Sequence, residues 1–389
     1  MSQADSTLSS ERGLSGAAAF GFYGSRLVFP LLLLLPPVRR WAVEARLLWP
    51  YLATLAFSFA FLFVPLVRSF ALWRGVLDHP DPRKVHAIAT PLLGGAAVYA
   101  AFALTVLYNF EFSRELKGVA VGATIVVIVG ILDDMFNLRA PLKLAGQVVG
   151  ALAALGYGVT LWIVPSAWPA AIWLNLLLTV LWFLTVTNAI QFLDGMDGLA
   201  TGLGAIASFF ISLTALQTSQ PYLMFLSAAL LGSCLGFLPY NFRFGAPAQV
   251  FLGDGGASFI GFTLAGLAVM GEWARDNPLI ALCTPVLILA VPLFDITFVA
   301  VNRVIAGKVR SVREWLAYVG RDHIHHRFEA IGLTKTESVL LIFFISFTLG
   351  LSAILLKDAT PYEAGLLLLQ AVFILSIVAV LESVGRRGG

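Results

Sequence analysis

Charged residues are scarce in this chain, and cysteine is almost absent. Only 12% of the 389 residues are charged, against roughly 25% in a soluble domain, whereas 59% are hydrophobic. This composition excludes an ordinary soluble globular protein. Cys234 and Cys283 both lie in apolar runs, which predicts buried thiols and argues against a disulfide framework. The net charge of +3 is too small to indicate a nucleic-acid partner, and we expect none.

Long apolar runs define the architecture instead. A membrane-spanning helix needs about 20 apolar residues, and runs of this length exclude the strands of a membrane barrel. We therefore predict an all-α, polytopic integral membrane bundle with about eleven transmembrane helices. The predicted spans cover residues 49–70, 91–109, 117–132, 141–158, 170–187, 198–217, 222–239, 256–271, 278–302, 337–356 and 361–384.

The distribution of positive charge orients this bundle. If the spans alternate, one face receives residues 71–90, 133–140, 188–197, 240–255, 303–336 and the tail after 384. The connections on the opposite face contain only three Lys or Arg residues, Arg114, Arg275 and Lys357. The positive-inside rule makes the first face cytoplasmic, and the predicted catalytic loops lie on it.

The N-terminal part does not fit this alternation. We predict an extension over residues 1–48, partly disordered or interfacial, followed by one transmembrane domain over residues 49–389. The apolar run Leu27–Leu35 precedes Arg39 and Arg40, which would lie outside the cell, against the charge bias. An interfacial helix and a twelfth, short span both explain this segment.

Five polar islands interrupt the apolar sequence, and all of them fall on the predicted cytoplasmic face. They cover residues 78–95, 133–147, 188–202, 251–258 and 322–328. Ionisable side chains are costly near lipid, so islands of this kind indicate a function that needs them. Asp295 is different, because it lies inside the ninth predicted span. It costs about 2.5–3.5 kcal/mol at a helix centre, so we expect it to face the bundle interior and to have a partner.

The second island combines two carboxylates with a cation. Asp133 and Asp134 end the third span, and Lys143 and Gln147 follow, four residues apart on one face of the next helix. Adjacent carboxylates repel each other unless a cation lies between them, and a lysine or Mg²⁺ beside a phosphate supplies one. The alternative is an ordinary helix end that turns into water.

The third and fourth islands offer oxygen ligands among glycines. Asp194 and Asp197 each precede a glycine, downstream of Asn188, and glycine permits the backbone to approach a ligand closely. A structural turn is the alternative. The sequence Phe-Leu-Gly-Asp-Gly-Gly-Ala-Ser over 251–258 is similar to a phosphate-binding loop at a helix start. Asp254 within it suits a metal better than a phosphate, because like charges repel.

The first and last islands are basic. The sequence Asp-His-Ile-His-His-Arg over 322–327 contains three of the five histidines of the chain. Imidazole and guanidinium donors suit a pyrophosphate, whereas a zinc site would be expected to include cysteine ligands. A solvated basic loop is the alternative. Lys84 and His86 would hold a lipid phosphate or a nucleotide, although a positive-inside loop explains them equally well.

Taken in this order, the islands resemble the polyprenyl-phosphate N-acetylhexosamine-1-phosphate transferases of glycosyltransferase family 4, over roughly residues 50–385. The shared motifs are Arg-Lys-Val-His with Thr-Pro-Leu-Leu-Gly-Gly, Leu-Asp-Asp with Lys-Leu-Ala-Gly-Gln, Asn with Asp-Gly-Met-Asp-Gly, Phe-Leu-Gly-Asp-Gly-Gly, and His-Ile-His-His-Arg. The last motif is similar to the undecaprenyl-phosphate GlcNAc-1-phosphate transferase branch, which starts O-antigen, enterobacterial common antigen or teichoic acid linkage. It is unlike the peptidoglycan branch, which transfers phospho-N-acetylmuramoyl-pentapeptide.

The resemblance implies a Mg²⁺-dependent enzyme in which Mn²⁺ can substitute. Such an enzyme transfers a sugar-1-phosphate, first of all N-acetylglucosamine-1-phosphate, from a UDP-N-acetylhexosamine to a membrane polyprenyl (undecaprenyl) phosphate. UMP is released, and the product begins a cell-envelope polysaccharide. The implied location is the bacterial cytoplasmic (inner) membrane, among membrane lipids, with the active site facing the cytoplasm. The resemblance leaves homodimer formation open.

The resemblance also implies roles for individual residues. Asp254 would bind the metal, assisted by Asn188. Asp133 would deprotonate or orient the lipid phosphate with support from Asp134, and Lys143 would neutralise phosphate charge. The implied substrate-binding residues are Asp194, Asp197, His325, His326, Arg327, Lys84 and His86.

Two departures from the family pattern and two rival functions remain. Gln191 stands where the family commonly has an asparagine, and residues 311–320 differ from the usual pattern, which leaves the choice of sugar open.

A peptidoglycan-branch transferase is one rival function. The last polar island, residues 322–328, which we call the histidine island, argues against it. A membrane transporter is the other. It would place ionisable residues midway through several spans, where here only Asp295 lies.

Overall fold

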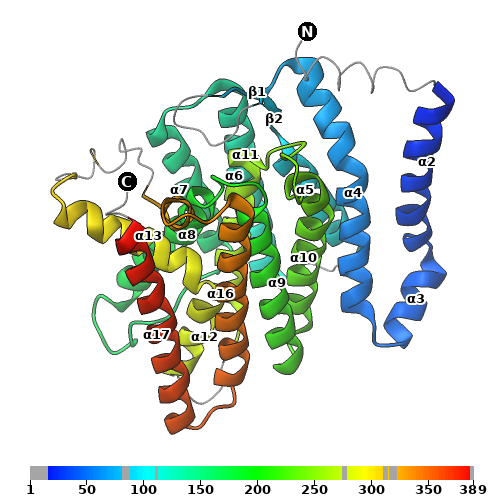
Figure 1. Cartoon of the computed structure of the whole chain (residues 1–389). Coiled ribbons are helices and arrows are strands. Elements are labelled where there is room, and N and C mark those ends of the chain that lie inside the picture. Colours follow the sequence, from blue (N-terminus) through cyan, green and yellow to red (C-terminus); the bar gives the residue numbers. More distant parts are fainter. Residues whose placement is uncertain are drawn as a thin grey trace.

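The computed structural model is a bundle of long helices that run roughly alongside one another (Figure 1). It describes residues 16–80, 88–109, 113–273, 278–309, 314 and 322–385. The elements are α2 (Gly16–Leu33), α3 (Pro36–Glu44), α4 (Leu48–Arg74), β1 (Leu77–Asp78), β2 (Thr90–Pro91), α5 (Gly94–Asn109), α6 (Arg114–Phe136), α7 (Ala140–Gly156), α8 (Ala171–Phe192), α9 (Leu199–Gln217), α10 (Pro221–Asn241), α11 (Gly253–Met270), α12 (Pro278–Ile288), α13 (Ala290–Ile305), α15 (Ile324–Ala330), α16 (Lys335–Leu356) and α17 (Pro361–Gly385).

The all-α membrane bundle is confirmed, and each of the eleven predicted spans is helical. Within the described residues, eight helices are long and apolar enough to cross a membrane on their own, or up to nine if α12 and α13 form one bent span. The helices α5 and α7 are apolar but shorter. The chain is therefore a multi-pass membrane protein, with fewer full-length straight spans than the sequence predicts.

The ninth predicted span is bent. The axes of α12 and α13 differ by 84°, and the break falls between Ile288 and Ala290. Pro292 explains the position of the break, because it has no N–H to donate to the carbonyl of Ile288 and its ring clashes with that turn. The bend lets α13 pack on α8 and places Asp295, in the second turn of α13, within hydrogen-bond distance of Ile324 at the start of α15.

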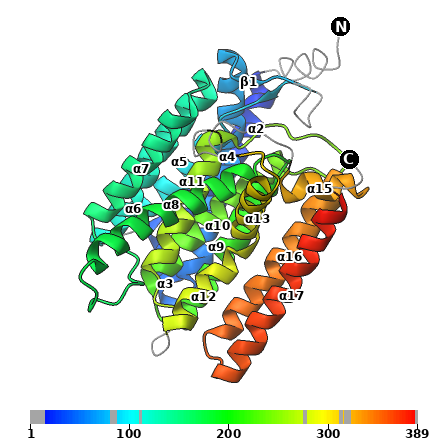
Figure 2. The same cartoon turned by 90° about the vertical axis from the view of Figure 1, so that its left-hand side faces the viewer.

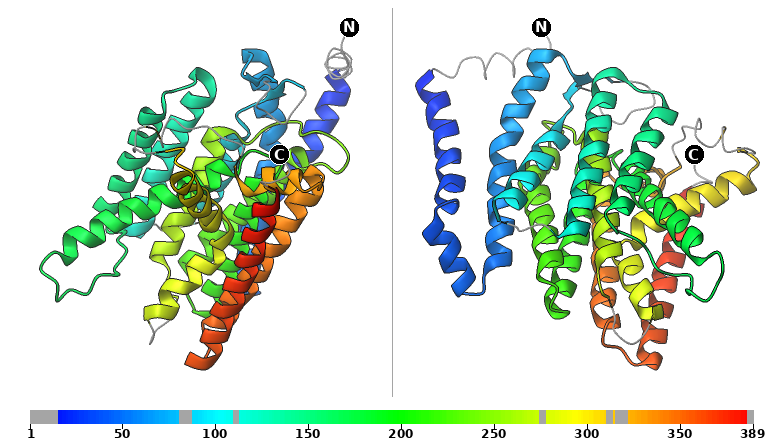
Figure 3. Two further views of the ribbon diagram at one scale, coloured as in Figure 1. Left: turned by 60° about the vertical axis from the view of Figure 1, so that its left-hand side comes forward. Right: turned by 180° about the vertical axis from the view of Figure 1, so that it is seen from behind.

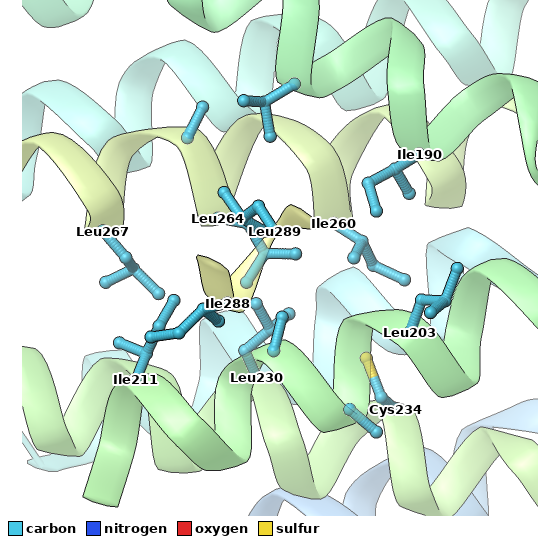
Figure 4. Packing of buried hydrophobic residues seen from close by; sticks show 14 of the residues in the cluster. Ile190, Leu203, Ile211, Leu230, Cys234, Ile260, Leu264, Leu267, Ile288 and Leu289 are labelled. Atoms are coloured by element: carbon cyan, nitrogen blue, oxygen red, sulfur yellow. The ribbon is translucent and has the colours of Figure 1, made fainter. Parts of the chain in front are cut away.

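The helix α11 lies at the centre of the bundle. It packs on α5, α6, α8 and α9, and its side chains are buried almost throughout. Figure 4 shows Ile260, Leu264 and Leu267 of α11 facing residues such as Leu203 and Leu230 of the neighbouring helices. Because α11 is enclosed on several sides, residues at its N-terminal end have fixed positions relative to the ends of α5, α6 and α8.

The outer helices have fewer contacts. In Figure 2, α16 and α17 run side by side along one edge of the bundle. Figure 3 shows α2 and α3 at another edge, with α2 alongside α4. Arg26 of α2 donates from Nη1 to the Tyr240 hydroxyl at 2.6 Å, and its guanidinium lies 4.5 Å from the centroid of the Phe61 ring. An arginine inside an apolar helix is thus stabilised by a hydroxyl and an aromatic face.

A two-stranded ladder joins the ends of α4, α5 and α11. The antiparallel strands β1 and β2 pair Leu77 with Pro91 and Asp78 with Thr90. The N–H of Phe251 donates to the Pro91 carbonyl at 2.8 Å, and the Gly95 N–H donates to the Leu252 carbonyl at 2.7 Å. The segment that precedes α11 is therefore fixed by backbone hydrogen bonds to the start of α5.

Close packing of two glycines makes a testable stability prediction. A Cβ placed on Gly95 would lie 2.1 Å from the backbone nitrogen of Gly256, so we expect Gly95→Val to force α5 and α11 apart. Overpacking of this kind costs about 1–3 kcal/mol or more, which should lower the unfolding temperature in detergent. Gly365→Val is the matched control, because nothing lies within 4 Å of a Cβ there. Equal unfolding temperatures for the two variants would contradict this packing.

Candidate active site

Two carboxylates from different helices share one lysine. Asp133 lies at the C-terminal end of α6, and Asp254 lies in the first turn of α11. The ammonium of Lys143, in α7, is 2.7 Å from Asp133 Oδ2 and 2.5 Å from Asp254 Oδ2. The sequence predicted a cation beside Asp133, and the structure shows that the second carboxylate on this cation belongs to Asp254.

A chain of amide groups extends from Asp254 to α8. Gln191 donates from Nε2 to Asp254 Oδ1 at 2.8 Å, and Gln147 donates to Gln191 Oε1 at 3.3 Å. Asn188 donates to Gln147 Oε1 at 2.7 Å. Lys143 and Gln147 therefore contact the same cluster, as their spacing predicted. We define the carboxylate cluster as Asp133, Lys143, Gln147, Asn188, Gln191 and Asp254.

Asp134 contacts the backbone of α11 and so positions Asp254. Its carboxylate accepts from the N–H of Asp254 at 2.8 Å and from the N–H of Gly255 at 3.2 Å. These are unsatisfied donors of the first helical turn, where an anion is favoured. Gly253 is required just before them, because its φ is +75° and a Cβ would lie 2.5 Å from Asp134 Oδ2.

The two aspartates of the third island lie in the turn between α8 and α9. Asp197 Oδ2 accepts from the backbone N–H of Ala248 at 2.9 Å, which attaches this turn to the segment before α11. Desolvation raises the pKa of Asp194 well above its usual range, and the Asp254, Asp134 and Asp197 carboxylates raise it further. The turn therefore lies within electrostatic reach of the carboxylate cluster, as the predicted roles require.

His325 approaches the same turn from the other end of the sequence. A Cβ on Gly195 would lie 2.6 Å from His325 Nε2, so the two residues are in contact. His325 is only 1% exposed, and among the described residues neither ring nitrogen has a hydrogen-bond partner. Burial, followed by the neighbouring His326 and His323, lowers its pKa well below the usual range. At neutral pH it is a neutral ring with one donor and one acceptor to offer.

The rest of the last island is supported by α13. Asp295 Oδ2 lies 2.6 Å from His323 Nδ1, and Asp295 Oδ1 accepts from the N–H of Ile324 at 2.7 Å. The expectation that Asp295 is buried with a partner is confirmed. Burial would raise the pKa of Asp322, but two hydrogen bonds from Arg303 make the net shift downward. His323 is absent from the predicted site residues. The sequence feature that pointed to it was the charge of Asp295 inside a predicted span, which required a partner.

His326 lies beside His325, with the two ring centroids 4.2 Å apart. His326 Nδ1 is 3.6 Å from a carboxylate oxygen of Glu329. Arg327 lines a small cavity that also contacts Arg303, Asp322 and Glu382, whereas a second cavity lies beside Lys143, Gln147 and Gln191. Lys84 and His86 lie outside the described residues.

The oxygen atoms of the carboxylate cluster suit a magnesium ion. Over the described residues, no three His, Cys, Asp or Glu side chains form a preformed metal site. Magnesium does not require one, since proteins hold it through one or two carboxylates together with substrate phosphates. Asp254 and Asp133 already share one cation, the Lys143 ammonium. Asn188 donates through Nδ2 to Gln147 Oε1 and to the Leu184 carbonyl, and its Oδ1 is an oxygen of the kind that suits a metal.

Comparison with known proteins places this arrangement in a family context. The sequence model of Glycosyl transferase family 4 matches residues 116–272, which include all six residues of the carboxylate cluster. A Bacillus subtilis protein named "Probable undecaprenyl-phosphate N-acetylglucosaminyl 1-phosphate transferase" is 34% identical over 82% of this chain and 87% of its own length. The decaprenyl-phosphate N-acetylglucosaminephosphotransferase of Mycobacterium leprae is 30% identical over 79% of this chain and 84% of its own. The undecaprenyl-phosphate alpha-N-acetylglucosaminyl 1-phosphate transferase of Yersinia pestis is 28% identical over 74% and 78%.

Proposed function

Because this chain belongs to the family of polyprenyl-phosphate N-acetylglucosamine-1-phosphate transferases, we propose that it transfers N-acetylglucosamine-1-phosphate from UDP-N-acetylglucosamine to a membrane polyprenyl phosphate. An oxygen of the lipid phosphate attacks the β-phosphorus of the donor. The bond from this phosphorus to the bridging oxygen breaks, and UMP leaves. The observation that carries the proposal is the convergence of Asp133, Lys143 and Asp254 from three helices into one polar cluster.

The residues of the carboxylate cluster and those around it suit distinct tasks in this reaction. Asp133 orients the lipid phosphate or accepts its proton, while the Lys143 ammonium offsets the charge of two phosphate groups in one pocket. Asp134 holds the start of α11 through two backbone N–H groups and so fixes Asp254. Asp194 and Asp197 position the nucleotide, and His325 donates to its diphosphate.

A divalent metal completes the proposed site. Asp254 and Asn188 would hold Mg²⁺ or Mn²⁺, which supplies positive charge to the diphosphate when bound. Gln191 would keep Asp254 in place through its hydrogen bond to Oδ1. The amide of Gln191 therefore supports the metal ligand indirectly, although it is one methylene longer than the asparagine common in the family.

An exposed apolar surface on α13 suits a prenyl chain. Beyond the bend, α13 exposes Val304 and Ile305, whose side chains are 63% and 78% exposed. The same helix holds Asp295 and Arg303, which contact the histidine island. We infer that the lipid acceptor approaches from the membrane along α13, with its phosphate directed at the carboxylate cluster.

The proposed function is tested by release of UMP. Purified protein in detergent should release UMP from UDP-N-acetylglucosamine only when polyprenyl phosphate and Mg²⁺ are both present. UDP-N-acetylgalactosamine and UDP-N-acetylmuramoyl-pentapeptide, offered in parallel, distinguish the sugar and the peptidoglycan branch. Asp358→Asn, at the opposite end of the bundle, is the control for a neutral acid-to-amide change. UMP release that does not require the lipid acceptor would contradict the proposal.

We further propose that the carboxylate cluster lies on the cytoplasmic side of the bacterial inner membrane. Cysteine labelling tests this orientation. Phe244, 73% exposed, lies in the segment before α11, and Trp168, 62% exposed, lies before α8 on the opposite face. In a variant with Cys234 and Cys283 replaced by serine, a membrane-impermeant maleimide added to intact cells should label cysteine at position 168. Position 244 should react only after the cells are broken. The reverse pattern would overturn the orientation.

A further inference from the structure

Asp295 carries a charge inside a membrane helix, and its partners all belong to the histidine island. It is fully buried, 0% exposed. One carboxylate oxygen accepts from the Ile324 N–H at 2.7 Å, and the other lies 2.6 Å from His323 Nδ1. A carboxyl group buried in this way needs hydrogen-bond donors, and the Ile324 N–H and the His323 ring are the groups in contact with it.

His323 is close to the proposed active site. Its ring lies 5.3 Å from the ring of Phe192, the residue that follows Gln191, and Gln191 donates to Asp254. On its other side, the ring is nearly parallel to that of His325 at 6.2 Å, and His325 contacts Gly195 in the turn between α8 and α9. His323 therefore lies beside the end of α8 and next to the histidine that contacts the turn holding Asp194.

We propose that Asp295 is a positioning residue for the transfer reaction. It accepts a hydrogen bond from Nδ1–H of His323 and so fixes the orientation of the ring, which presents Nε2 to the nucleotide donor. This inference rests on the proposed function and adds a residue from a membrane helix to it. The carboxylate does not touch the substrate. It acts through the imidazole, as carboxylates that orient histidines do elsewhere.

Several other ionisable groups surround the pair of Asp295 and His323. Arg303 and Asp322 form a bidentate pair of their own beside it, so their charges largely offset each other. His325 and His326 follow on α15, and Glu382 of α17 lies within electrostatic range of Asp295 and Arg327. The carboxylate in direct contact with the His323 ring is that of Asp295.

The hydrogen-bonded pair of Asp295 and His323 predicts a change in KM. Without the carboxylate, the His323 ring is no longer held in one orientation, so KM for the nucleotide donor should rise in Asp295→Asn while kcat changes less. Because hydrogen bonds to charged groups are the stronger kind, kcat/KM should fall by about 10- to 100-fold, mainly through KM. The asparagine can still accept from the Ile324 N–H, so the start of α15 should remain in place. Asp358→Asn should keep the wild-type KM.

A double-mutant cycle separates positioning from simple structural support. His323→Gln should cost about as much as Asp295→Asn, and the double variant should be no worse than His323→Gln alone. Losses that multiply in the double variant would overturn the proposal, as would a loss in Asp295→Asn that falls on kcat with KM unchanged. If Asp295→Asn does not fold, Asp295→Ser, which also keeps an acceptor at this position, takes its place in the cycle.

Binding of UDP, followed by calorimetry, gives a readout independent of turnover. Asp295→Asn and His323→Gln should each weaken UDP binding by about 10-fold or more, and Asp358→Asn should not. If the wild type binds UDP more tightly than both variants but releases no UMP, the proposed function fails while the role of Asp295 stands. If the wild type releases UMP and both variants bind UDP as tightly as the wild type, the role of Asp295 fails while the function stands.

Discussion

Replacing Asp254 by asparagine is expected to abolish Mg²⁺-dependent release of UMP, with a loss of roughly 10³-fold or more in kcat. Asp254 is the carboxylate on which the cluster converges, because Lys143 binds Oδ2 and Gln191 binds Oδ1. Asparagine has the same shape and can still accept from Gln191. It lacks the negative charge that a divalent metal and the Lys143 ammonium require.

The fold should survive this change, which makes the activity loss interpretable. The backbone N–H of residue 254 still donates to Asp134, so the start of α11 is retained. We expect the unfolding temperature of Asp254→Asn in detergent to stay within a few degrees of the wild type, as for the control Asp358→Asn. Binding of Mn²⁺, measured by electron paramagnetic resonance, should weaken in Asp254→Asn alone. Full turnover in this variant would remove Asp254 from the metal site.

The helical bundle could be predicted from the sequence because apolar runs of about 20 residues have few other structures available in lipid. The bend between α12 and α13 could not be placed, since Pro285 and Pro292 both lie in one continuous apolar run. Which proline breaks the helix depends on packing against neighbouring helices. The position of the N-terminal helix α2 could not be predicted for a similar reason. Arg26 of this helix contacts Tyr240, which is 214 residues away in the sequence.

The candidate site could be predicted as a set of residue types, and its pairings could not. The sequence places Asp133 next to Asp134 and suggests that they act together. In the structure they diverge, with Asp133 on Lys143 and Asp134 on the backbone of α11. Consecutive helical residues point about 100° apart, so neighbours in sequence reach different partners. The pairing of Asp295 with His323 spans 28 residues, and Asp295 lies just after the bend between α12 and α13.

Lys143→Gln is expected to separate turnover from metal affinity. The Lys143 ammonium holds Asp133 and Asp254 together, at 2.7 Å and 2.5 Å. Without it, two carboxylates face each other with no fixed positive charge, and a divalent cation becomes the group that relieves their repulsion. We therefore expect the affinity for Mn²⁺ to stay the same or increase, while kcat for UMP release falls by about 10²- to 10³-fold.

The opposite movement of these two quantities identifies the task of the lysine. If Lys143 neutralises phosphate charge during transfer, Lys143→Arg should restore part of kcat, because guanidinium keeps the charge with altered geometry. Lys117→Gln, an exposed lysine near the far end of α6, is the matched control and should change neither quantity. A parallel fall of Mn²⁺ affinity and kcat in Lys143→Gln would instead mean that the lysine only maintains the geometry of the metal ligands. The charge of Lys143 would then have no role of its own in the transition state.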